Sequence, residues 1–202
     1  TGERPGRGPY PMSEAAIRTR RWTRVEYDKL IDTGFLGPGD KIELLGGQLC
    51  VSEPQNSPHA RAISLGLETL QKALAPGWHV RVQMPIALDP ESEPEPDLAV
   101  VSGGPRDYVD HPSRPALVVE VADSSLAFDR EHKGSLYARA RLPEYWIVNL
   151  VGRILEVYRE PGLDAGAQYG WAYRVLLTLR ADEHVTPLAA PSARIPVADF
   201  LP

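Results

Sequence analysis

The hydrophobic and polar positions at the start of the chain predict a helix followed by a β-hairpin. Thr23 and Glu26 form a capping-box pair, and apolar residues at helical spacing follow as far as Gly34. Two short apolar runs, 41–45 and 48–51, are separated by two glycines, which is the usual pattern of a tight hairpin. We therefore expect a first helix up to Gly34 and two paired strands after it.

The middle of the chain changes between helical and strand periods. Apolar residues three or four positions apart predict a long helix that begins at Ser57 and ends before Pro76. Alternating residues over 78–88 predict a strand, and short apolar runs over 97–101 and 116–122 predict two more. The run over 116–122 is rich in β-branched residues, which is typical of a strand that is covered on both faces.

The last third of the chain adds one helix and several strands. The helix is predicted from about 129 to 141. Further elements follow as strands over 145–150, 153–159, 171–179 and 185–188 and a closing helical turn over 197–201. This order favours one mixed central β-sheet flanked by helices, with additional β-hairpins, in the α+β or α/β class. Residues 1–12 are rich in Gly and Pro and predict a disordered leader, so we expect a single domain over 13–202.

The composition supports one globular domain in a reducing compartment. The 202 residues are 43% hydrophobic and 24% charged, which is enough to build one sizeable core. No apolar run approaches the roughly 20 residues that span a bilayer, and the N-terminal stretch lacks the apolar segment of a secretory signal. The single cysteine, Cys50, lies in an apolar run and predicts a buried thiol. We therefore expect a cytoplasmic protein with no membrane contact.

The charge distribution bears on nucleic-acid binding. The formal net charge is −5, whereas proteins that clasp duplex DNA usually present a basic face. A bound metal would neutralise part of the acidic charge, so the balance does not exclude DNA. The densest basic segment is 18–21 (RTRR) with Arg24 close behind it. It predicts either a solvated edge before the first helix or a surface that binds phosphate.

Glu120 is the most informative single residue. It lies inside the apolar run ALVVEVA, where an unpaired carboxylate costs several kcal/mol or takes up a proton. A side chain at a solvated edge, or paired with an arginine, would explain it equally well. Asp97 begins another apolar run directly after Pro96, and by itself this pattern is a common end of a turn. Two carboxylates on adjacent core strands repel each other unless a cation or a proton lies between them, and oxygen ligands favour magnesium or manganese.

Lys133 lies on the helix predicted after Glu120. The face formed by Asp129, Lys133, Leu136, Tyr137 and Ala140 should pack on the sheet, so the lysine would project from a partly buried surface. The alternative is an ordinary ion pair with Asp129, four residues earlier on the same helix.

Five segments follow one another along the chain: 43–47 (ELLGG), 96–101 (PDLAVV), 118–121 (VVEV), 129–133 (DREHK) with 136–138 (LYA), and 143–148 (PEYWIV). Together they resemble the Uma-two family of restriction endonucleases, within the PD-(D/E)XK nuclease superfamily. The similarity runs from about Thr23 to Phe200. No single segment is specific, but all occur in the order of the family.

The resemblance implies a metal-dependent nuclease site. Asp97 and Glu120 would bind Mg²⁺, for which Mn²⁺ would substitute, with the main-chain carbonyl of Val121 as a further ligand. Ala122 stands where the superfamily has its lysine, and the resemblance implies that Lys133 on the next helix replaces it. Glu43 would complete the catalytic set, unless it is an exposed residue paired with Lys41.

Other residues near the expected cleft have less certain roles. His59 and Gln83 are candidates to face the same cleft, although a histidine near the start of a helix is more often a capping or surface residue. Glu93 and Glu95 are expected to be solvated charges of an acidic, proline-rich loop, close enough to Asp97 to affect metal binding.

The expected function is hydrolysis of DNA phosphodiester bonds, with a homodimer formed through strands within 157–179. One alternative is an inactive nuclease fold that binds DNA or acts as a scaffold, which the acidic net charge and Ala122 favour. Another is a glycosidase using Glu43 and Glu120, which would need an aromatic-lined cleft. Aromatic residues are only 7% of the chain, which disfavours the glycosidase.

Overall fold

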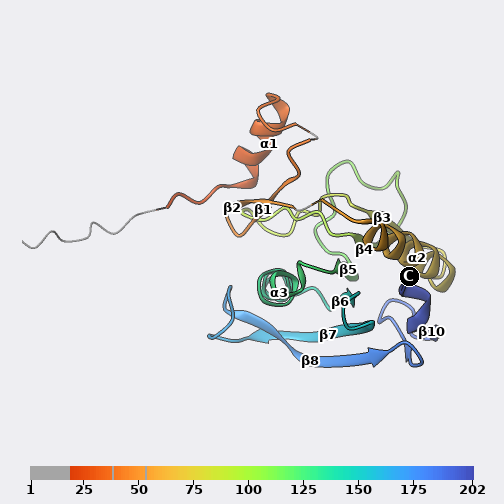
Figure 1. The fold of residues 1–202 in the computed structure, drawn as a ribbon. Helices are drawn as coiled ribbons and strands as arrows, with labels where there is room; N and C mark the ends of the chain where they lie inside the picture. Colours follow the sequence, from red (N-terminus) through yellow and green to blue (C-terminus); the bar gives the residue numbers. More distant parts are fainter. Residues whose placement is uncertain (1–18, 38, 53) are drawn as a thin grey trace, which may run out of the picture.

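The computed structural model describes residues 19–202 except 38 and 53, so the leader predicted for residues 1–12 lies outside the described part. The helices are α1 (Arg24–Asp32), α2 (Ser57–Ala73), α3 (Leu126–Phe128), the π-helical turn η1 (Asp129–Lys133), α4 (Gly134–Arg139) and the 3₁₀ turn η2 (Val197–Phe200). The strands are β1 (Ile42–Leu45), β2 (Gln48–Val51), β3 (Trp78–Val82), β4 (Leu98–Ser102), β5 (Leu117–Ala122), β6 (Glu144–Asn149), β7 (Ile154–Leu163), β8 (Trp171–Arg180), β9 (His184–Val185) and β10 (Ile195–Pro196). Figure 1 shows their arrangement.

The central sheet has six strands in the order β3-β4-β5-β6-β7-β8. Its only parallel pair is β5 with β6, and the other neighbours are antiparallel. A parallel pair needs a crossover, and the helical segment α3-η1-α4 supplies it. The prediction of a mixed central sheet flanked by helices is confirmed, and β1-β2 and β9-β10 form two additional small sheets.

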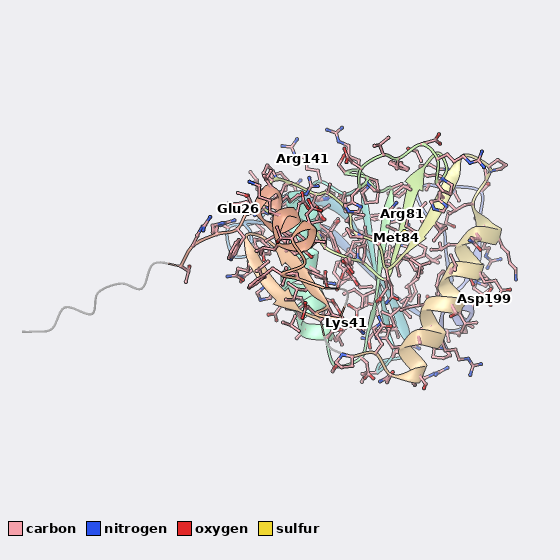
Figure 2. All side chains as sticks on the ribbon, turned by 90° about the horizontal axis from the view of Figure 1, so that it is seen from above. Glu26, Lys41, Arg81, Met84, Arg141 and Asp199 are labelled. Carbon is pink, nitrogen blue, oxygen red and sulfur yellow. The ribbon has the colours of Figure 1, made fainter. Side chains whose placement is uncertain are left out.

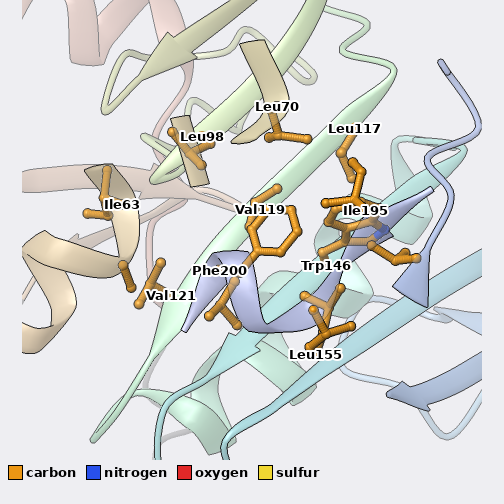
Figure 3. Packing of buried hydrophobic residues seen from close by; sticks show 14 of the residues in the cluster. Ile63, Leu70, Leu98, Leu117, Val119, Val121, Trp146, Leu155, Ile195 and Phe200 are labelled. Carbon is orange, nitrogen blue, oxygen red and sulfur yellow. The ribbon is translucent and has the colours of Figure 1, made fainter. Parts of the chain in front are cut away.

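Both faces of the sheet are covered. One face packs against α2 and the C-terminal segment, where Figure 3 shows Leu98, Val119 and Trp146 next to Phe200. The other face carries the smaller cluster around Tyr137 and Tyr145, which α4 covers. All six residues of β5 are buried, as the continuous apolar run predicted.

The close packing of α2 on the sheet depends on a glycine. A Cβ atom at Gly66 would lie 2.8 Å from Cδ1 of Leu98, closer than real Cβ contacts allow. The absence of a side chain therefore lets the helix lie directly against β4.

The N-terminal elements form as predicted. The capping box of Thr23 and Glu26 is present at the start of α1. The β1-β2 hairpin turns through Gly46 and Gly47, with φ angles of 55° and 80°, a conformation that favours glycine at both positions. The hairpin is joined to the acidic loop by a bridge between Leu44 and Glu93, which brings β1 over the start of β4.

Four element boundaries differ from the predictions. The strand predicted over 78–88 ends at Val82, because Gln83 adopts a φ of +47° that breaks the extended backbone. The strand predicted over 185–188 is limited to His184–Val185 and stops before Pro187, which cannot donate to a ladder. The strand predicted over 153–159 continues to Leu163.

The helix predicted from Asp129 begins three residues earlier, at Leu126, and its middle is a π-helical turn rather than regular α-helix. This turn adds a residue relative to the α-helical period, and Ala140, assigned to the buried face, is only partly buried. Within the described residues, no helix combines the length and apolar character required to cross a bilayer.

Candidate functional site

Asp97 lies at the start of β4 and is held by donors from four parts of the chain. Its Oδ2 atom accepts a hydrogen bond from the main-chain N–H of Val121 at 2.8 Å and lies 3.1 Å from Nε2 of His59. Its Oδ1 atom accepts from the side-chain amides of Gln55 and Gln83, each at 3.4 Å. The carboxylate is therefore fixed in place at the end of the sheet where β3 ends and β5 nears its end.

Glu120 projects from β5 on the same side as Asp97. The main-chain N–H of Asp97 lies 3.4 Å from Glu120 Oε2, so the two acids meet across neighbouring strands. Glu120 Oε1 accepts hydrogen bonds from Lys133 Nζ at 3.0 Å and from the hydroxyl of Tyr137 at 2.7 Å. The side chains of Glu120 and Lys133 are only 4% and 8% exposed, so this ion pair is removed from water.

Glu43 joins the same cluster from the hairpin. Its Oε2 atom lies 3.5 Å from Lys133 Nζ and accepts the main-chain N–H of Glu95 at 3.0 Å, while Oε1 accepts the hydroxyl of Ser52 at 2.7 Å. Because Glu43 is buried, the interpretation of an exposed residue paired with Lys41 is wrong. The structure thus brings together three of the predicted acids and the predicted lysine, from β1, β4, β5 and η1.

The π-helical turn determines the direction of Lys133. The N–H of Gly134 donates to the carbonyl oxygen of Asp129, five residues back, and this oxygen also accepts the hydroxyl of Tyr145 at 3.1 Å. The Asp129 carboxylate accepts from Ser125 Oγ at 2.6 Å rather than pairing with Lys133. The alternative of an ordinary ion pair along the helix is therefore not what the geometry shows.

A second ion pair, between the half-exposed Arg130 and the buried Glu156, anchors this turn to the sheet. Arg130 donates from Nε and Nη2 to both oxygens of Glu156 on β7, at 2.9 and 2.6 Å. Asn149 and Tyr158 donate to the same carboxylate at 2.8 and 2.7 Å. A bidentate pair has a defined geometry, so this contact fixes the residue three positions before Lys133.

The electrostatics of the cluster follow from burial and from an excess of acids. Burial raises the pKa of Glu120 to about 8, and the charge of Lys133 opposes this shift. For Lys133, burial acts to lower the pKa, but Glu120, Glu43 and Asp129 outweigh it and hold the pKa well above its ordinary value. Burial also raises the pKa of Asp129. The lysine is thus charged, and the site carries more acid than this single ammonium compensates.

The donor set fits a hard divalent cation bound partly through the main chain. In the described part of the chain, no group of three or more His, Cys, Asp or Glu side chains is arranged to hold a metal ion. A metal would therefore use the carboxylates of Asp97 and Glu120 together with other oxygen atoms. The N–H of Val121 points at Asp97, and in a strand the carbonyl of the same residue points to the same side. The Val121 carbonyl thus supplies a hard oxygen of the kind that magnesium binds.

Two residues of the site were not predicted as functional. Tyr137 was assigned to the apolar face of the helix, and its hydroxyl contact with Glu120 depends on packing against β5. Gln55 lies in the connection before α2, where the sequence shows no periodic pattern. By contrast, His59 and Gln83 do face Asp97, as the sequence suggested.

Two expectations about charged and polar residues require correction. Glu93 is 1% exposed and pairs with Arg24 Nε at 2.6 Å, so it is not a solvated loop charge, whereas Glu95 is exposed as expected. Cys50 is half-buried rather than buried. The described arginines of the basic N-terminal segment, Arg20 and Arg21, form ion pairs with Glu26 and Glu91, as Arg24 does with Glu93. Arg20 and Arg21 are exposed, so their part of the segment is the solvated edge that was one of the two predictions, and Arg18 lies outside the described residues.

Comparison with known proteins points to a nuclease family. The sequence model of the Uma2 family, described as "Putative restriction endonuclease", matches residues 24–198. Among solved structures, the fold is similar to that of a "putative nuclease belonging to DUF820" from Anabaena variabilis, with a TM-score of 0.64 and 14% sequence identity. The similarity covers 88% of this chain and 96% of that one. No curated protein matches the chain.

Proposed function

The chain belongs to the Uma2 family, and on this premise we propose that it is a metal-dependent endonuclease that hydrolyses DNA phosphodiester bonds. The observation that carries the proposal is the meeting of Asp97 and Glu120 across neighbouring strands, with the buried ammonium of Lys133 at 3.0 Å from Glu120. A structural ion pair needs one acid, whereas here Glu120 and Glu43 both contact the lysine and Asp97 lies next to Glu120.

Asp97, Glu120 and the carbonyl of Val121 are the residues that would hold Mg²⁺, for which Mn²⁺ would substitute. When bound, such an ion supplies a Lewis acid and lowers the pKa of a coordinated water. His59, Gln55 and Gln83 hold the Asp97 carboxylate in one orientation through the hydrogen bonds described above. Their role is to position this acid.

Lys133 is the group in this chain that can stabilise the negative charge that develops on the phosphate, or orient the attacking water. Its ammonium is preorganised, because Glu120 and Glu43 hold it on two sides and burial excludes water. Tyr137 fixes the Glu120 oxygen that Lys133 also contacts. Glu43 acts through Lys133, as a positioning residue for the ammonium.

The test compares wild-type protein with Asp97→Asn and Glu120→Gln, which keep side-chain size and remove one charge each. We expect Mg²⁺- and Mn²⁺-dependent cleavage of plasmid DNA by the wild type and loss of cleavage in both variants, with circular dichroism unchanged. Isothermal titration with Mn²⁺ should show binding that is lost in Asp97→Asn. Equal cleavage by the purified variants would contradict the assigned site, and metal-independent DNA binding without cleavage would favour the inactive scaffold.

We also propose that the protein forms a homodimer through β7 and β8. The strand β8 is at the edge of the central sheet, where its Leu176 is 53% exposed, and Leu163 at the end of the neighbouring β7 is 75% exposed. Long edge strands with exposed apolar residues tend to pair with another strand. Sedimentation velocity should show a dimer that dissociates in Leu176→Lys, and a monomeric wild type would contradict this assignment.

A further inference from the structure

Two hollows lie beside α2, and they differ in charge. One, of about 550 Å³, has acidic and basic residues in its lining, including Glu68, Asp199, Lys72 and Arg194. The other, of about 420 Å³, lies between the start of α2 and the β6–β7 turn. Its lining includes Arg61 from α2 and Arg153 from the turn and, among the described residues, no Asp or Glu side chain. The second hollow is therefore the positive one.

The positive hollow lies on the same edge of the sheet as the candidate site. Asp97 precedes β4, β5 ends at Ala122, and Arg153 is in the turn that joins the end of β6 to the start of β7. Neighbouring strands are about 4.8 Å apart, so two to three strand spacings separate the two positions, or roughly 10–15 Å. Along duplex DNA, where phosphates of one strand follow every 3.4 Å or so of the axis, this is about three to four nucleotides.

The two guanidinium groups of the hollow are available for a ligand. In the described part of the chain, Arg61 has no ion-pair or hydrogen-bond partner, and Arg153 donates only to the main-chain oxygen of Pro202, at 3.1 Å. Ser57 contributes a hydroxyl to the same lining, and the first turn of the 17-residue helix α2 contains no acid. Other arginines, such as Arg130 and Arg159, are bound to buried carboxylates and serve the fold.

We infer that Arg61 and Arg153 bind a phosphate of the DNA backbone a few nucleotides from the bond that is cut at Asp97. The inference rests on the proposed nuclease function and identifies the face of the protein along which the DNA lies. Guanidinium groups present several N–H donors in a planar fork that matches phosphate oxygens. Contacts of this kind contribute affinity and orientation without reading sequence. They would also give a chain of net charge −5 two positive charges beside the site at which to meet a polyanion.

The experiment measures binding of a fluorescently labelled DNA duplex by anisotropy, in a buffer with Ca²⁺, over a series of salt concentrations. The test variant is Arg61→Gln/Arg153→Gln. The matched control is Lys72→Gln/Arg194→Gln, which removes two positive charges from the lining of the other hollow. We expect the test variant to reduce the slope of log affinity against log salt by about 1 for each arginine, and the control to leave it unchanged.

The outcomes separate this inference from the proposed function. If the wild type does not bind the duplex, the nuclease proposal and the inference that rests on it both fail. The inference is overturned, while the nuclease proposal stands, if the wild type binds and the test variant keeps the full salt slope. The same holds if the test and control variants lose equal parts of that slope. Arg61→Lys/Arg153→Lys, which retains both charges, should keep most of the slope. Thermal unfolding of each variant verifies that it is folded. The single change Arg61→Gln, at an exposed residue, should reduce the salt slope by about half as much as the double change.

Discussion

Replacing Lys133 with methionine removes the only cation that contacts Glu120 and Glu43 among the described residues, while keeping the length of the side chain. The ammonium lies 3.0 Å from Glu120 and 3.5 Å from Glu43, and its side chain is 8% exposed. Loss of one partner of a buried ion pair costs about 3–5 kcal/mol, because the remaining charge stays buried without compensation. For a domain of this size each kcal/mol lowers Tm by about 2–4 °C, so we expect a fall of roughly 6–20 °C in the metal-free protein.

The loss should depend on pH. The pKa of Glu120 is raised by burial above its value in the unfolded chain, so protonation favours the folded state. The stabilising contribution of this group is complete below the unfolded value of 4.5 and is lost as pH rises through the folded value of about 8. Without Lys133 the folded pKa rises further. The Tm difference between Lys133→Met and wild type should therefore be larger near pH 9 than near pH 6.

The assay is thermal unfolding followed by circular dichroism in EDTA, for wild type, Lys133→Met, Glu120→Gln and the double variant. Glu120→Gln removes the charge that Lys133 compensates, so the double variant should lose less stability than the sum of the single changes, by about 1–3 kcal/mol. Additive losses, or a Lys133→Met variant as stable as the wild type at both pH values, would refute the assignment of a buried, energetically coupled pair.

Two further predictions concern the supports of the site. Tyr137→Phe removes a hydrogen bond to Glu120 and should lower the free energy of unfolding by about 1 kcal/mol in urea, with reduced cleavage; unchanged stability and cleavage would contradict its role. For Glu156, burial acts to raise the pKa, but the hydrogen bonds of Arg130, Asn149 and Tyr158 outweigh it and lower the pKa below 4.5. Glu156 therefore stabilises the fold at pH values above its pKa in the unfolded chain, and this contribution is lost as pH falls through its lower pKa in the folded state. In Glu156→Gln the loss of stability below about pH 5 should be less steep than in the wild type. If the stability of Glu156→Gln falls with decreasing pH as steeply as that of the wild type, this role of Glu156 is disproved.

Much of the fold followed from local patterns. The capping box at Thr23, the two glycines of the β1-β2 turn and the β-branched run of β5 each specify a conformation over a few residues. The proximity of Asp97 and Glu120 on neighbouring strands could be predicted as well, because both lie in apolar core runs. A carboxylate inside such a run requires a compensating charge, which Lys133 provides. The strand predicted as far as Leu88 was wrong, since its alternating pattern continues through Gln83 although the backbone turns there.

The sequence by itself determined the apolar runs that form the core strands and the charge that lies inside one of them, Glu120. Only the tertiary structure decided which charges meet. Lys133 could pair with Asp129 on its own helix, yet the π-helical turn and the Arg130–Glu156 contact direct it to Glu120, and Glu43 reaches it from the hairpin. These partners are distant in sequence, and their contact depends on how the helix and hairpin pack on the sheet. The periodicity of a single segment reports its buried face, but not the polar group that lies opposite.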